Sequence, residues 1–86
     1  MLYLRNLIAE NELYVAQFYM KKKAYLAAAT RANYIVVHFD QSPHVEEALA
    51  IMVQAYRKLD LITLANDAYA VLKLNFPDSH YVGKLA

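Results

Sequence analysis

The sequence contains no cysteine, one glycine and two prolines among its 86 residues. Without cysteine the chain can form neither a disulfide nor a zinc site with thiolate ligands. The scarcity of glycine and proline leaves few positions for tight turns, which favours a few long helices over many short strands. We therefore expect an all-α fold.

Charge and hydropathy exclude further classes. Nine basic and eight acidic residues are interspersed and give a net charge of +1, so the sequence lacks the basic patch typical of nucleic-acid binding. No apolar run approaches the roughly 18–20 residues that a membrane-spanning helix requires. Residues 1–6 have neither the basic region nor the cleavage site of a secretory signal, so if the parent protein is exported, we expect its targeting segment to lie upstream.

Apolar residues are abundant and make up 59% of the chain. The core of an 86-residue chain is too small to bury so many apolar residues. We therefore expect exposed apolar faces that pack against further repeats or a partner protein. Self-association through such faces is a further expectation.

The sequence repeats itself with a period of 37 residues. When residues 8–49 are aligned with residues 45–86, eight positions are identical. The identical pairs are Glu10 and Glu47, Gln17 and Gln54, Tyr19 and Tyr56, Lys21 and Lys58, Ala28 and Ala65, Phe39 and Phe76, Ser42 and Ser79, and Val45 and Val82. A period of this length is typical of stacked supersecondary units, which bury their apolar faces against one another. The repeat therefore favours a binding scaffold.

Apolar spacings of three and four predict helices over residues 3–22, 25–39, 43–59 and 61–76. The connections are about two to five residues long, so successive helices must run antiparallel. The predicted fold is an α-solenoid fragment of two stacked helix hairpins with a short C-terminal cap. The hairpins are expected over residues 1–40 and 41–78, and the cap over residues 79–86.

Polar residues and proline mark the predicted helix ends. Ser42 is the expected N-cap of the third helix, with Pro43 in its first turn. Asp60 is the expected N-cap of the fourth helix. Pro77 ends that helix because the residue before a proline is disfavoured in the α region.

The sequence gives little support for catalysis, and we expect no enzyme, cofactor or metal. Ser42 and Ser79 stand at predicted helix starts, where capping explains them. His38, His44 and His80 lack the i, i+4 pairing that allows two histidines to share a metal on one helix.

Three tyrosines and one lysine are candidates for contact with a partner protein. Tyr3, Tyr14 and Tyr34 fall off the main apolar stripes, and a partly exposed tyrosine is favoured at interfaces. Lys21 begins a run of three lysines at the end of the first helix, where a basic side chain also complements the helix dipole.

Two features resemble a known family. Helices with a small–x–x–Tyr pattern, joined by tight turns to helices that close on Phe-Pro-Asp-Ser, resemble the tetratricopeptide (TPR) repeat of bacterial envelope lipoproteins. Residues 15–31, Val-Ala-Gln-Phe-Tyr-Met-Lys-Lys-Lys-Ala-Tyr-Leu-Ala-Ala-Ala-Thr-Arg, resemble the last two repeats of the BamD family. The chain departs from that family at Asp40, where proline is usual, and at Lys23, where a turn glycine is frequent.

The resemblance implies a non-catalytic component of the outer-membrane β-barrel assembly complex, at the periplasmic face of the outer membrane. Its partners would be the POTRA domain of the barrel-forming subunit and accessory lipoproteins. In that family an arginine early in the second helix of the penultimate repeat contacts the POTRA domain, and it corresponds to Arg31. Arginine suits this role because it can bind a carboxylate through two hydrogen bonds. Tyr34, Lys21 and Gln17 are the other predicted partner-binding residues.

An alternative is a general TPR module that binds an extended peptide or a chaperone tail in its concave groove. It predicts that several Lys, Arg or Asn side chains converge on the concave face of the first helix of each hairpin. Gln17, Lys21, Gln54 and Lys58 recur in register and keep this alternative open.

Overall fold

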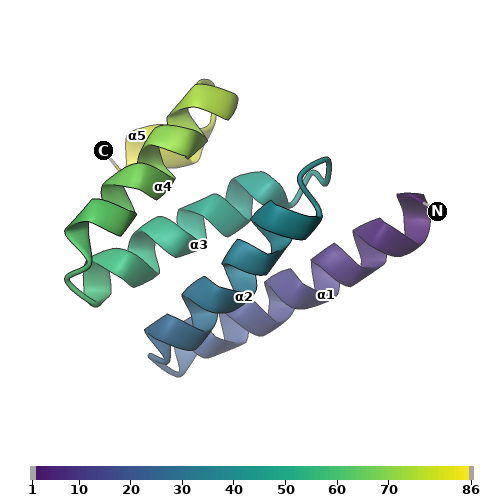
Figure 1. Cartoon of the computed structure of the whole chain (residues 1–86), viewed down its shortest axis with the longest axis horizontal. Coiled ribbons are helices and arrows are strands. Elements are labelled where there is room, and N and C mark those ends of the chain that lie inside the picture. The colour runs from purple at the N-terminus through teal and green to yellow at the C-terminus, as the bar shows by residue number, and fades with distance from the viewer. Residues whose placement is uncertain (1, 86) are drawn as a thin grey trace.

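Five helices follow one another in the computed structural model, which describes the backbone of residues 2–85 and the side chains of residues 7–85 (Figure 1). They are α1 (Leu2–Lys21), α2 (Tyr25–His38), α3 (Val45–Lys58), α4 (Ile62–Asn75) and α5 (His80–Leu85). No strand forms within residues 2–85. The prediction of an all-α fold with stacked helix hairpins is confirmed. Tyr3, one of the interface candidates, lies outside the described side chains.

The turns within the two hairpins have the same backbone geometry. Lys23 and Asp60, 37 residues apart, both have a left-handed backbone, with φ of 63° and 60°. The N–H of Ala24 donates to the carbonyl of Tyr19, and the N–H of Leu61 donates to the carbonyl of Tyr56, each at 2.9 Å. A left-handed residue with such a bond is a common way for a helix to end.

Asp60 therefore does not have the role predicted from the sequence. Leu61 is the N-cap of α4, without a side-chain capping bond. Asp60 instead belongs to the turn that ends α3, in a conformation that Asp tolerates better than most non-glycine residues do.

The turns that follow α2 and α4 also match. Ser42 donates its N–H to the carbonyl of Phe39 at 2.8 Å, and Ser79 donates to Phe76 at 3.0 Å. Each serine hydroxyl accepts a backbone N–H from two residues further on, at 3.2 Å in both turns. The repeat seen in the sequence is thus also a repeat of backbone hydrogen bonds.

The N-cap predicted at Ser42 is displaced by two residues. His44 is the residue that precedes α3, and it makes no side-chain capping bond. Ser42 instead caps a turn that leads into the helix, because its hydroxyl accepts the N–H of His44 and its carbonyl accepts the N–H of Val45 at 3.3 Å.

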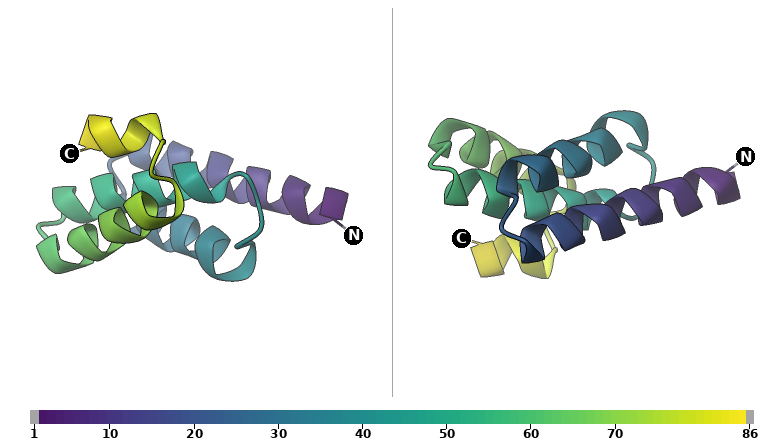
Figure 2. Two further views of the ribbon diagram at one scale, coloured as in Figure 1. Left: turned by 90° about the horizontal axis from the view of Figure 1, so that it is seen from above. Right: turned by 90° about the horizontal axis from the view of Figure 1, so that it is seen from below.

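Helix α3 is the centre of the core and packs against all four other helices. Eight of its residues are buried, and Leu49 and Val53 are among the largest fully buried side chains of the described chain. Ala28 and Ala65, an identical pair of the 37-residue repeat, are both buried, with exposures of 0% and 1%. Figure 2 shows α2 and α4 on one side of α1 and α3, with α5 on the other side.

The C-terminal segment forms the short helix α5, which packs on α3 and α4. Leu85 is buried in the common core. The hydroxyl of Tyr69 on α4 donates to the carbonyl of Val82 at 2.8 Å. These contacts attach α5 to the second hairpin.

Candidate functional site

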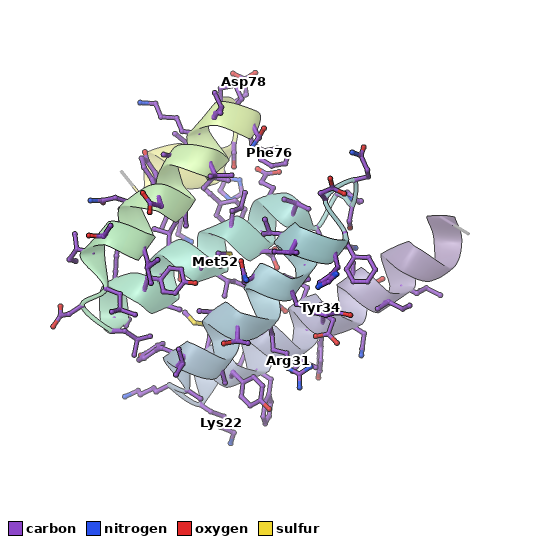
Figure 3. The ribbon with its side chains drawn as sticks, in the orientation of Figure 1. Lys22, Arg31, Tyr34, Met52, Phe76 and Asp78 are labelled. Atoms are coloured by element: carbon purple, nitrogen blue, oxygen red, sulfur yellow. The ribbon has the colours of Figure 1, made fainter. Side chains whose placement is uncertain are left out.

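Arg31 lies on α2 and forms an ion pair with a glutamate of α1. Its Nη1 is 3.2 Å from Oε2 of Glu12, and the Arg31 and Glu12 side chains are 47% and 17% exposed. The bond uses one guanidinium N–H of the five that arginine carries, so further donors remain for a partner. Figure 3 shows Arg31 at the outer edge of α2.

The ion pair occupies positions that are apolar in the second hairpin. A shift of 37 residues takes Glu12 to Leu49 and Arg31 to Ala68. Leu49 and Ala68 are buried and line one apolar groove. Because the same fold is built at these positions with apolar side chains, packing alone does not require a charged pair in the first hairpin.

Tyr34 extends the exposed surface around Arg31. The two residues are three apart on α2 and therefore share a helix face. The Tyr34 side chain is 45% exposed, and its ring lies 4.3 Å from the ring of His38 and 5.8 Å from that of Phe39, measured between centroids. We call Arg31, Tyr34 and Glu12 the Arg31 surface.

Gln17 belongs to a different cluster, in which three helices meet at Glu47. Gln17 Nε2 on α1 donates to one carboxylate oxygen of Glu47 on α3. The Tyr81 hydroxyl on α5 donates to the other oxygen at 3.1 Å. Burial raises the pKa of Tyr81, and the hydrogen bond and negative charge of Glu47 raise it further. We call these three residues the Glu47 junction.

A groove of about 560 Å³ lies beside this junction, between α1 and α3. Its lining includes Leu7, Glu10, Tyr14, Gln17, His44 and Glu47. The Tyr14 side chain is 70% exposed. Glu10 and Glu47 occupy the same position of the 37-residue repeat, so the stacking of the hairpins brings equivalent carboxylates to one groove.

Comparison with known proteins identifies the family. A family model described as YfiO, outer membrane lipoprotein, matches residues 1–72. The chain belongs to the YfiO family. It is 45% identical to the outer membrane protein assembly factor BamD of Neisseria gonorrhoeae over 82 residues, which are 95% of this chain and 31% of that protein. The predicted resemblance to BamD is confirmed.

Two further relatives of this YfiO-family chain carry the same description. BamD of Xylella fastidiosa strain Temecula1 is 41% identical over 75 residues, which are 87% of this chain and 26% of the relative. BamD of Haemophilus influenzae is 35% identical over 75 residues, which are 87% of this chain and 29% of the relative. The chain thus spans about a third or less of the length of these proteins.

The YfiO-family chain does not bring its four predicted partner-binding residues to one site. Arg31 and Tyr34 share the Arg31 surface, while Gln17 lies in the Glu47 junction. Lys21 is exposed in the last turn of α1, one turn after Gln17. Since Glu12 is five residues before Gln17, about 140° away around α1, the ion pair and the junction contact different sides of this helix.

Glu12, Glu47 and Tyr81 were not predicted as functional residues. Their partners are 19, 30 and 34 residues distant in the sequence, so only the packing of the helices pairs them. The recurrence of glutamate at positions 10 and 47 was the one sequence signal for the groove.

The described residues include no cluster of three or more His, Asp or Glu side chains able to hold a metal ion. Within the same part of the chain, no helix combines the length and apolar character needed to cross a membrane.

Proposed function

We propose that this chain is part of a non-catalytic scaffold for outer-membrane protein assembly, and that the Arg31 surface docks a POTRA domain of the barrel-forming subunit. The membership of the YfiO family and the BamD relatives support a role in assembly. The observation that carries the docking surface is the charged pair of Arg31 and Glu12, which stands where the second hairpin has buried Leu49 and Ala68.

The proposed contact is a salt bridge between the Arg31 guanidinium and a carboxylate of the POTRA domain. Glu12 holds Nη1 and restricts the orientation of the guanidinium plane, so less side-chain entropy is lost when the partner binds. The Tyr34 ring supplies adjacent apolar area. An exposed ion pair contributes little to the stability of a fold. An arginine at the desolvated centre of an interface, in contrast, can contribute a large part of the binding free energy.

The rest of the proposal concerns location and other partners. The scaffold would act at the periplasmic face of the outer membrane, held by a lipid anchor upstream of these residues, and would also bind accessory lipoproteins. Recognition would depend on shape and charge complementarity, without a cofactor.

The test is binding of the chain to a purified POTRA-domain protein, measured by isothermal titration calorimetry. We expect Arg31→Glu to weaken binding at least tenfold, since it places two carboxylates opposite each other. Arg31→Lys should cause a smaller loss because a lysine cannot form the two parallel bonds. Arg57→Glu is the matched control, since Arg57 is also exposed and lies over the ring of Tyr69 on another helix. Equal affinities for the wild type and Arg31→Glu would refute this docking surface.

A further inference from the structure

We propose that the groove between α1 and α3 binds an arginine side chain carried by a segment of a partner protein. This site is additional to the POTRA contact and does not depend on it. The peptide-binding alternative relied on lysine side chains, which would favour an acidic peptide. Carboxylates rather than lysines line this groove, so it favours a basic peptide instead.

The first support is the repeated glutamate. Glu10 of α1 and Glu47 of α3 stand 37 residues apart and line the same groove, so the stacking of the hairpins places two equivalent glutamates in one lining. Neither lysine nor arginine is among the described residues that line it. The groove therefore has a negative character that a cationic side chain complements.

The second support is the way in which Glu47 is held. Gln17 and Tyr81 each donate a hydrogen bond to one of its two carboxylate oxygens. Both donors are uncharged, so they fix the orientation of the carboxylate without neutralising it. Each carboxylate oxygen can accept more than one hydrogen bond, which leaves acceptor positions for a ligand. The junction is thus a pre-oriented acceptor.

The third support is Tyr14, whose side chain is 70% exposed beside these carboxylates. A planar guanidinium can stack on an aromatic face while it donates to a carboxylate, and Leu7 offers apolar lining to the aliphatic stem. This combination favours arginine over lysine as the occupant.

The groove and the Arg31 surface can be tested separately. Glu10 and Glu12 are two residues apart on α1, so their side chains point about 200° apart around the helix axis. Glu12 contacts Arg31, whereas Glu10 faces the groove. A variant at Glu10 therefore leaves the proposed POTRA contact intact, and failure of one proposal does not imply failure of the other.

The experiment is an NMR titration of the isotope-labelled 86-residue chain with a capped heptapeptide that carries one central arginine. The control peptide replaces arginine with citrulline, which has nearly the same shape but no charge. We expect saturable shifts of the amide signals of Glu10, Tyr14 and Glu47 with the arginine peptide, and at least tenfold weaker binding of the citrulline peptide, as expected when a charge-assisted bond is lost.

Variants locate the site. Glu10→Gln and Glu47→Gln should each weaken binding of the arginine peptide at least fivefold. Glu46→Gln removes the same charge from the neighbouring residue of α3, which is not among the groove lining, and should change affinity less than twofold. Glu10 is exposed, so its variant decides the question even if Glu47→Gln disturbs folding. Equal binding of the two peptides, shifts at other residues, or no shifts at millimolar peptide would each overturn the proposal.

Discussion

Lys23 and Asp60 share a left-handed backbone conformation at equivalent points of the two hairpins, with φ of 63° and 60°. This conformation is strained for residues with a Cβ atom and is readily adopted by glycine. Both turns are therefore built on residues that are not ideal for them, and both turns offer a direct test of the repeat geometry.

The first prediction is that Lys23→Gly and Asp60→Gly each stabilise the fold. Relief of left-handed strain should exceed the extra entropy of glycine in the unfolded chain. We expect the free energy of unfolding to rise by about 0.5–1 kcal/mol at Lys23, and by less at Asp60, since aspartate tolerates this conformation better. Urea denaturation followed by circular dichroism measures the change. Lys22→Gly is the control, because Lys22 does not have a positive φ and should lose stability. A loss in all three variants would contradict the assigned turns.

The second prediction concerns the hydrogen bond of Tyr81. Tyr81→Phe removes the donor to Glu47 and should lower the free energy of unfolding by about 1 kcal/mol, the usual contribution of such a bond. Tyr14→Phe is the control, since its side chain is 70% exposed. Amide hydrogen exchange should show the loss of protection chiefly in α5. Unchanged exchange there would show that this bond does not hold the helix.

The third prediction is a pH dependence of the same bond. The pKa of Tyr81 is raised above its ordinary value of 10.0, mainly by burial and then by Glu47. The folded state therefore binds this proton more tightly than the unfolded state does. Its contribution to stability is fully present below pH 10 and is lost as the pH rises from there through the folded-state pKa. The wild type should lose more stability than Tyr81→Phe when denaturation is measured at pH 9 and again above pH 10. Parallel losses in the two proteins would exclude this linkage.

The fourth prediction is that the ion pair of Arg31 and Glu12 contributes little to folding. A double-mutant cycle with Arg31→Ala and Glu12→Ala should give a coupling energy of about 0.2–1 kcal/mol, because the Arg31 side chain is 47% exposed. A coupling of several kcal/mol would mean that the pair is primarily structural, and would weaken the case for a docking surface.

The fifth prediction places the core at α3. Leu49→Ala should destabilise the fold by about 2–5 kcal/mol, since its side chain is 1% exposed and truncation leaves a cavity. Leu74→Ala is the matched control: its side chain is 80% exposed, and the change should be within about 0.5 kcal/mol. Thermal denaturation distinguishes the two. Equal effects would contradict the packing described for α3.

The sequence predicted the helices well because apolar spacing reports which face of each helix is buried. It predicted the equivalence of the hairpins because the positions that form turns and close contacts, such as Ser42 and Ser79, recur after 37 residues. It placed Asp60 wrongly because aspartate suits both a helix N-cap and a left-handed turn, and the choice depends on where the preceding helix ends.

The site was less predictable. Arg31 and Tyr34 share a helix face, which their spacing shows, but the partner of Arg31 depends on the packing of α2 against α1. The Glu47 junction joins residues of three helices. Its hydrogen bonds follow from the stacking of whole hairpins, so no local pattern in the sequence could reveal them.

The most direct test of the docking proposal is a charge-swap experiment. Carboxylates on the surface of the POTRA domain are reversed one at a time to arginine, and each variant is titrated with the wild-type chain and with Arg31→Glu. The account predicts that one reversal weakens binding to the wild type and restores binding to Arg31→Glu, because opposite charges then face each other again. If Arg31→Glu binds the unmodified POTRA domain as tightly as the wild type does, the account is contradicted.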